Sequence, residues 1–234
     1  MRRDPFRGHR FPREVILCAV RWYCRFGLSY RDVRDLLAER GVAVDASSVH
    51  RWVRKFGPEI AKRMTKHRTW PGTCWHMDET YLRVGGRWCY LWRAIDRKGQ
   101  VVDFRLTGRR DLKVARAFFR RTQDAARCFQ PSAITTDKAH SYKRVIAEAN
   151  RRALPGEEIV HVTPKGANNR IESDHAALKK ITTPMRGFRS LSSARATLRG
   201  IEAVRAIRRG HVHPQPSGIT GEIRFLRGLF GIAA

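Results

Sequence analysis

Residues 75–96 read "WHMDETYLRVGGRWCYLWRAID", two runs rich in Trp, Tyr, Val and Leu that are separated by two consecutive glycines. Runs of this composition around a two-glycine turn predict a tight β-hairpin, with strands over 75–84 and 87–96. A third strand is expected over 100–106, after the turn "DRKG". The hairpin therefore predicts the start of an antiparallel sheet.

The segments after these strands alternate between helix and strand. A helix is expected over 111–128, a short strand in "SAITT" at 132–136, and further helices beyond it. Three antiparallel strands followed by a helix, another strand and more helices predict an α/β core with a mixed sheet. This order of elements is that of the ribonuclease H-like fold.

The first third of the chain predicts a small all-α domain that precedes this core. Helices are expected over 14–26 and 30–40, each ended by a glycine, and a third begins near Asp45 or Ser47. Apolar residues recur at helical spacing along the third helix. The residues left on its opposite face are Ser47, Arg51 and Arg54. This pattern favours helix-turn-helix DNA binding, and the alternative is a three-helix bundle with a solvated charged face.

The chain divides into four parts by composition. We expect the helix-turn-helix domain at 1–66, a linker at 67–73 that contains Pro and Gly, the catalytic core at 74–189 and a basic C-terminal helix with a tail at 190–234. The C-terminal helix is expected to pack on the core or to mediate self-association. The final apolar stretch is too short to span a membrane and is expected to be a docking segment.

The charge balance points to a polyanionic partner. Lys plus Arg number 48 and Asp plus Glu number 21, which gives a net charge of +27. Such self-repulsion favours nucleic acid as the partner. No apolar run predicts a spanning helix or a signal peptide, so a cytoplasmic location is expected. The five cysteines form no CxxC pair and no zinc-ligand set, so reduced, mostly buried thiols are expected.

Three carboxylates are candidates for a metal site. Asp78 lies within the first strand, where an ionised carboxylate is costly unless a cation is near. Asp137 ends the fourth strand, and open α/β sheets gather functional groups at such ends. Glu172 lies on the helix predicted in "NNRIESDHAALKK" at 168–180. If the three converge, they form an all-oxygen site suited to Mg²⁺ rather than to zinc.

Each acid also has a structural interpretation. Asp137 is a candidate N-cap for the next helix, and Glu172 a candidate solvated helix residue. Adjacent strand residues face opposite sides, so only one of Asp78 and Glu79 can face the site. The spacing favours the catalytic interpretation: 172 − 137 − 1 = 34 residues separate the second and third acids. Lys179, seven positions beyond Glu172, shares its helix face and could contact a phosphate.

These acids, their spacing and Lys179 resemble the DDE transposases, which are related in fold to retroviral integrases. The chain is similar, more narrowly, to the insertion-sequence-six family in five blocks that occur in order between residue 27 and about residue 203. The blocks are "GLSYRDVRDLLAERGV", "WHMDETY", "TDKAHSY", "NNRIESDHAALKK" and "MRGFRSLSSARATLRGIE". One departure is Ala176-Ala177, where the resemblance leads us to expect polar or basic residues that contact DNA.

The resemblance implies a bacterial or archaeal transposase that binds the terminal inverted repeats of its own element. It implies nicking of each 3′ end by water, joining of the 3′-OH to target DNA, and replicative transposition through cointegrates. Asp78, Asp137 and Glu172 are then the catalytic residues and the ligands of two Mg²⁺ ions, for which Mn²⁺ can substitute, and Lys179 contacts DNA. The implied partners are double-stranded DNA, as transposon ends and target, and further copies in a homodimer or larger homo-oligomer, at the nucleoid and without a membrane.

Two other functions stay open on the sequence. A metal-dependent nuclease of the same fold would share the acids but would release cut DNA without joining it. A helix-turn-helix regulator would bind DNA without needing Asp137 and Glu172. In the catalytic interpretation, we expect the neighbouring acids Glu79 and Asp174 to tolerate neutral substitution far better.

Overall fold

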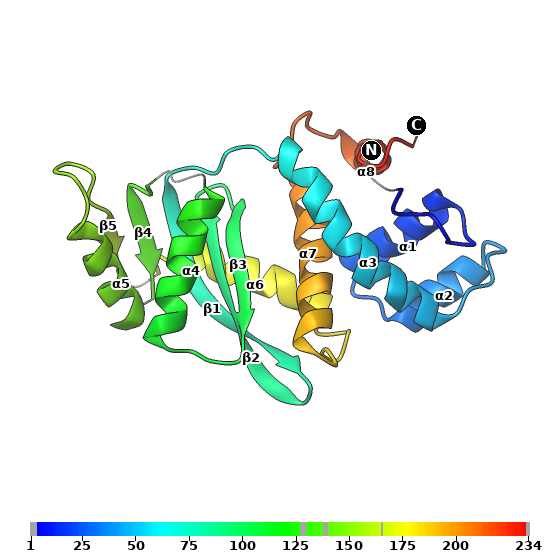
Figure 1. Ribbon diagram of the computed structural model, residues 1–234, viewed down its shortest axis with the longest axis horizontal. Coiled ribbons are helices and arrows are strands. Elements are labelled where there is room, and N and C mark those ends of the chain that lie inside the picture. The colour runs from blue at the N-terminus through cyan, green and yellow to red at the C-terminus, as the bar shows by residue number, and fades with distance from the viewer. Residues whose placement is uncertain (1–3, 127–129, 138–139, 165, 233–234) are drawn as a thin grey trace. The chain divides into compact units, whose positions relative to one another are not determined.

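The computed structural model describes residues 4–126, 130–137, 140–164 and 166–232 (Figure 1). The chain forms two compact units. The helical unit comprises Met1–Thr69, Ile181–Met185 and Ser192–Ala234, and the sheet unit comprises Trp70–Lys180 and Arg186–Leu191. Within the described ranges, no helix combines the length and the apolar character that crossing a membrane requires.

The helical unit begins with three helices, as the apolar spacing predicts: α1 (Arg13–Arg25), α2 (Tyr30–Ala38) and α3 (Ala46–Met64). Ser29 caps α2 because its hydroxyl accepts a hydrogen bond from the main-chain N–H of Asp32, whose carboxylate accepts one from the N–H of Ser29. The apolar stripe of α3 is buried. Its residues are Val49, Trp52, Val53 and Phe56.

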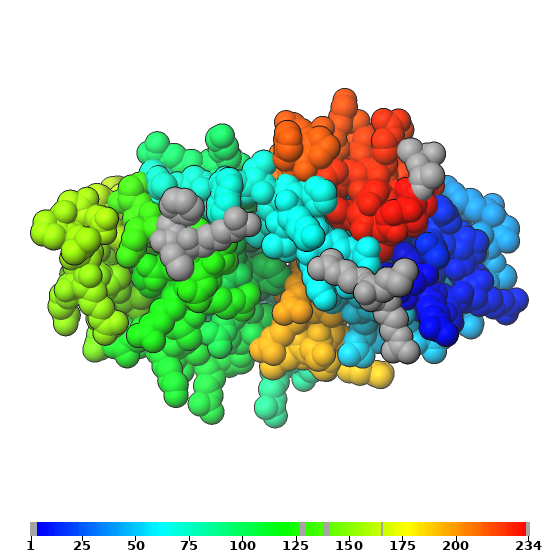
Figure 2. All heavy atoms as spheres, turned by 45° about the horizontal axis from the view of Figure 1, so that its top comes forward, coloured from blue at the N-terminus to red at the C-terminus, as the bar shows by residue number. Residues whose placement is uncertain are grey.

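The C-terminal segment packs within the same unit. The short 3₁₀ helix η1 (Thr65–His67) follows α3, and α7 (Leu191–Arg208) and α8 (Gly218–Gly228) come after the sheet unit. Helices α1 and α8 lie side by side (Figures 1 and 2). The Glu222 carboxylate on α8 accepts hydrogen bonds from Arg21 and Arg25 on α1, and all three side chains are nearly buried. The first and last segments of the chain are therefore joined by a buried charge cluster.

Helices α3 and α7 approach each other closely at two glycines. A Cβ atom added at Gly200 would lie 3.0 Å from the Cα atom of Gly57 and 2.9 Å from the sulfur atom of Cys24. Side chains at either glycine would force the helices apart, because packed interiors leave no room for an added methyl group. This crossing attaches α7 to the N-terminal helices.

The sheet unit contains five strands: β1 (Cys74–Val84), β2 (Arg87–Asp96), β3 (Val101–Thr107), β4 (Ala133–Thr136) and β5 (Val160–Val162). Their order is β3-β2-β1-β4-β5. The first three strands pair antiparallel, while β4 runs parallel to both β1 and β5. This is the mixed sheet of a ribonuclease H-like core, as the sequence predicts, and β5 is a strand of it that the sequence did not reveal.

Helices cover both faces of this sheet. Helices α4 (Leu112–Ala125) and α5 (His140–Asn150) pack on one face, where Trp92 of β2 contacts Phe118 and Tyr142. Helix α6 (Asn169–Thr182) covers the other face (Figure 1). Alternation along β1 therefore directs neighbouring residues toward different helices.

The cysteines in the described part of the chain are free thiols. Cys24 and Cys89 are buried, whereas Cys18 and Cys74 are half-buried. Cys128 lies outside the described residues, as does the end of the helix predicted over 111–128.

Candidate active site

Asp78 and Glu79 face opposite sides of the sheet, so only one of them faces α6. The Glu79 carboxylate lies on the side of α4 and α5, with Oε1 3.2 Å from Nε of Arg110. The Asp78 carboxylate lies on the side of α6, with Oδ2 3.7 Å from Nδ1 of His175. Asp78 is the acid that the sequence selects for the site.

Asp137 follows β4 directly beside Asp78. The register pairs Thr136 with Met77, and the parallel strands place the next residue of each, Asp137 and Asp78, at the same level. Asp137 is therefore the residue that follows a central strand of the sheet. The N-cap interpretation depends on residues 138 and 139, which lie outside the described residues.

Glu172 approaches the same place from the first turn of α6. Burial raises the pKa of Asp78 to about 7, and the negative charges of Asp137, Glu79 and Glu172 raise it as well, although a hydrogen bond from the main chain of Glu79 lowers it. The carboxylates of β1, β4 and α6 therefore act on one another electrostatically. Asp137 and Glu172 are themselves exposed.

A buried ion pair attaches α6 to the sheet beside these acids. Arg93 of β2 lies directly opposite Asp78 in the antiparallel register, and its side chain is fully buried. Its guanidinium donates a hydrogen bond to the buried carboxylate of Asp174 on α6. The arginine nearest to Asp78 along the register is thus engaged by another acid.

This ion pair corrects one expectation from the sequence. Glu79 and Asp174 were expected to tolerate neutral substitution, but both carboxylates are buried and each pairs with an arginine. Removing one partner of a buried ion pair is strongly destabilising. Neither residue is therefore a neutral control for the catalytic acids.

Sequence reasoning also missed Arg93 and His175. His175 follows Glu172 by three positions on α6, a spacing that places two side chains on neighbouring parts of one helix surface. That spacing was the available signal for His175. Arg93 gave no signal, because its partner Asp174 is 81 residues away in the sequence.

The remaining predicted residues are exposed. Lys179 lies on α6, and Ser47, Arg51 and Arg54 lie on the outer face of α3 in the helical unit. Arg51 donates a hydrogen bond of 2.9 Å to the hydroxyl of Ser48. All four are accessible to a ligand.

The donor set at the acids suits a hard cation. The described residues contain no group of three His, Cys, Asp or Glu side chains already arranged around a common metal position. Carboxylate oxygens are nevertheless the ligands that Mg²⁺ prefers, and the raised pKa of Asp78 reflects burial first and nearby negative charges second, both of which a bound cation would offset. Asp78, Asp137 and Glu172 therefore fit the metal in the chemistry of their side chains.

Solved structures of other recombination proteins show a limited likeness to the chain. The catalytic core domain of HTLV-2 integrase, in complex with magnesium, aligns with 68% of this chain and 97% of that chain, at 14% identity and a TM-score of 0.43. The Mos1 strand transfer complex aligns with 96% of this chain and 78% of that chain, at 12% identity and a TM-score of 0.41.

Sequence relatives are much closer. The family described as a DDE domain matches residues 72–211. The transposase for insertion sequence-like element IS431mec from Staphylococcus aureus is 38% identical over 202 residues, which cover 86% of this chain and 88% of that protein. The transposase for insertion sequence element IS257 in transposon Tn4003, also from Staphylococcus aureus, is 37% identical with the same coverage. The chain belongs to the DDE transposases of the insertion-sequence-six family.

Proposed function

We propose that this transposase nicks the 3′ ends of its own insertion sequence and joins them to target DNA, with Asp78, Asp137 and Glu172 as its catalytic residues. The observation that supports the proposal is the position of Asp78 on β1: burial raises its pKa to about 7, and the charges of Asp137 after β4 and of Glu172 on α6 raise it as well. The nearby arginines Arg93 and Arg110 pair with other acids. Neither arginine therefore takes the place of a cation beside Asp78.

The three acids would hold two Mg²⁺ ions, with Mn²⁺ as a substitute. Such a pair generates a nucleophile from water or a 3′-OH and stabilises the leaving oxygen in an in-line displacement. His175 contacts Asp78 and limits the orientations of its carboxylate. Lys179, on the exposed surface of α6, would contact a phosphate of the bound DNA. No serine or cysteine nucleophile is needed.

The two reactions use the same carboxylates. Water attacks the phosphodiester at the transposon end first, which releases the transposon 3′-OH and leaves a 5′-phosphate on the flanking strand. The 3′-OH would then attack a phosphodiester of the target DNA, which breaks the target strand and releases its own 3′-OH. Because only the 3′ ends are cut, the 5′ ends of the element stay attached to the donor DNA. Replication of this joined product would then produce a cointegrate.

The helical unit would recognise the element's ends. Ser47, Arg51 and Arg54 lie exposed on α3, opposite its buried apolar stripe, as on the recognition helix of a helix-turn-helix domain. Two ends must be held together for joining, so we propose a homodimer or a larger homo-oligomer that acts on double-stranded DNA in the nucleoid.

The proposal is tested by neutralising the acids one at a time. Glu172→Gln, Asp78→Asn and Asp137→Asn should each bind terminal-repeat DNA as the wild type does, yet lose both nicking and strand transfer by orders of magnitude in Mg²⁺. Glu157→Gln is the matched control, because Glu157 is an exposed acid of the sheet unit without an ion pair in the described chain. Near-normal strand transfer by Glu172→Gln would contradict the assignment, and cutting without joining by the wild type would identify a nuclease.

A further inference from the structure

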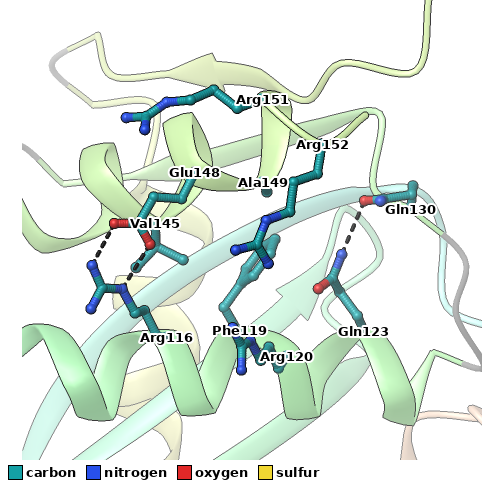
Figure 3. A pocket seen from close by; sticks show the side chains of 10 residues that line it. All are labelled: Arg116, Phe119, Arg120, Gln123, Gln130, Val145, Glu148, Ala149, Arg151 and Arg152. Carbon is teal, nitrogen blue, oxygen red and sulfur yellow. Dashed lines mark hydrogen bonds and ion pairs between the residues drawn. The ribbon is translucent and has the colours of Figure 1, made fainter. Parts of the chain in front are cut away.

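A basic pocket lies on the outer surface of the sheet unit, in the groove between α4 and α5 (Figure 3). Its volume is about 570 Å³. Four of its lining residues are arginines and one is an acid. These are Arg116, Arg120, Arg151, Arg152 and Glu148.

The one acid of this pocket is already neutralised. Arg116 donates two hydrogen bonds to the carboxylate of Glu148, through Nε and Nη2. These hydrogen bonds lower the pKa of Glu148, and the charges of nearby arginines lower it further. Four arginines minus one glutamate leave a charge of +3 around the pocket. Self-repulsion of this kind is relieved by an anion.

The other three arginines remain available. Arg120, Arg151 and Arg152 are exposed, and none makes an ion pair within the ranges that the structure describes. A guanidinium presents a planar fork of N–H donors that matches the oxygens of a phosphate. Arg120 on α4 and the two arginines of the turn that follows α5, Arg151 and Arg152, can therefore contact successive phosphates of one backbone.

The pocket also offers surfaces for the rest of a nucleotide. Figure 3 shows Arg120 and Arg152 beside the ring of Phe119, with the Arg116–Glu148 pair on one side and a hydrogen bond of 3.0 Å between Gln123 and Gln130 on the other. Phe119 is nearly buried and belongs to the core beneath the pocket, whereas the two amides can donate hydrogen bonds to sugar oxygens or accept them from sugar hydroxyls. The lining thus suits a sugar-phosphate chain better than a small inorganic anion.

The pocket lies away from the catalytic carboxylates. Gln130 precedes β4 and Asp137 follows it, so the two mark opposite ends of this strand. Four strand residues span about 13 Å. A phosphate held at the pocket is therefore not the phosphate that reacts.

We propose that the pocket between α4 and α5 binds the sugar-phosphate backbone of duplex DNA, as a second contact beyond the catalytic carboxylates. The proposal rests on the proposed function in one respect, the choice of DNA as the anion. The contact is independent of sequence and holds target or flanking DNA against the sheet unit.

The test measures how DNA affinity depends on salt. The full-length triple variant Arg120→Gln/Arg151→Gln/Arg152→Gln is compared with the wild type on a duplex that lacks the terminal repeat, across a NaCl series. Each phosphate contact contributes about 0.9 to the slope of log K against log salt, so the slope should fall by about 2 to 3. If the triple variant unfolds at a lower temperature than the wild type, the double variant Arg151→Gln/Arg152→Gln is used instead, and it should lower the salt slope by about 2.

The matched control removes the same charge elsewhere. Arg199, Arg208 and Arg224 are exposed residues of the helical unit, and their replacement by Gln should change the slope less. If the slope falls equally in both triple variants, the loss of three positive charges anywhere on the protein explains the change, and the proposal is wrong. An unchanged slope in the folded pocket variant would overturn the proposal too. Oligoglutamate serves as a model of an acidic peptide: if the pocket variant loses only oligoglutamate binding and keeps DNA binding, the pocket is a protein-binding site and the proposal is wrong.

Nicking separates this proposal from the proposed function. With saturating protein on a terminal-repeat duplex, the pocket variant should nick at a rate within about threefold of the wild type, because its carboxylates are intact. Failure of the wild type to nick in Mg²⁺ would refute the transposition chemistry. The salt slopes would still decide whether the pocket binds DNA.

Discussion

Two adjacent carboxylates on β1, Glu79 and Asp78, lie on opposite faces of the sheet and have different partners. On the side of α4 and α5, the Glu79 carboxylate is paired with Arg110. On the side of α6, Asp78 contacts His175 and lies near Asp137 and Glu172, and its pKa rises to about 7. A chain with 48 basic residues could have placed an arginine there. The carboxylate beside Arg110 is neutralised within the fold and contributes to it, whereas a group of carboxylates whose charges raise the pKa of one another's members is suited to an external cation.

Replacing Asp78 and Glu79 one at a time should give the largest difference between the two faces of β1. Asp78→Asn should abolish nicking and strand transfer while leaving the fold intact, because it removes a charge that has no arginine partner. Glu79→Gln should instead lower the free energy of unfolding by about 1–3 kcal/mol, because it weakens the pair with Arg110. Denaturant unfolding and a nicking assay on both variants provide the measurement. Equal catalytic losses with equal stability would remove the distinction between the faces.

The ion pair between Arg93 and Asp174 extends the comparison to the buried side of α6. Asp174→Asn should lower the free energy of unfolding by about 3–5 kcal/mol, because it leaves the buried guanidinium without its carboxylate. The double variant Arg93→Met/Asp174→Leu should recover part of that loss, since it buries no unpaired charge. Urea unfolding of the single and double variants measures the difference. Strictly additive losses would show that the pair is not coupled.

The pKa of Asp78 predicts a pH dependence of the metal-free protein. The folded-state value of about 7 lies above the ordinary value of 3.8, so folding favours the protonated acid. Stability from this group is complete below about pH 4 and is lost as the pH rises through 7, by up to about 4 kcal/mol for a pKa difference of about 3. Asp78→Asn should flatten the curve of unfolding free energy against pH between 4 and 8. Mg²⁺ should restore stability at pH 8 in the wild type only.

Lys179 gives the smallest expected effect. If it contacts one phosphate, Lys179→Ala should lower the salt slope of DNA binding by about one. Lys66→Ala, at an exposed lysine of η1 in the helical unit, is the control for loss of one charge. A slope equal to that of the wild type would leave Lys179 as a solvated residue.

Local patterns in the sequence predicted much of the fold. The hairpin was predictable because glycines at its turn and alternating residues along its strands act over a short range. Strand β5 was missed because Val160–Val162 is too short to show a period. The end of helix α8 was predicted to be an apolar docking segment and not a helix, because its glycines weaken helix propensity. In the structure, burial of Leu226 and the pairing of Glu222 with Arg21 and Arg25 stabilise the helix.

For the site, spacing and resemblance selected Asp78, Asp137 and Glu172, whose catalytic role stays a prediction. The structure places Asp137 at the end of β4, beside β1, and the charges of Asp137 and Glu172 contribute to the raised pKa of Asp78. The partners that distinguish these acids from their neighbours were not predictable. Arg110 and Arg93 are 31 and 81 residues from Glu79 and Asp174, and only the folded sheet and its helices bring them together.

The pairing of Glu222 with Arg21 and Arg25 also has a consequence during synthesis on the ribosome. The chain leaves the helical unit after Thr69 and supplies Glu222 only 222 − 69 = 153 residues later. At about 5–20 residues per second, that interval is roughly 8–30 s. During this time Arg21 and Arg25 of α1 cannot pair with Glu222, because Glu222 has not yet been synthesised. A polypeptide released early would carry the α3 surface on an incomplete scaffold, and we expect it to compete poorly with the finished protein for the element's ends.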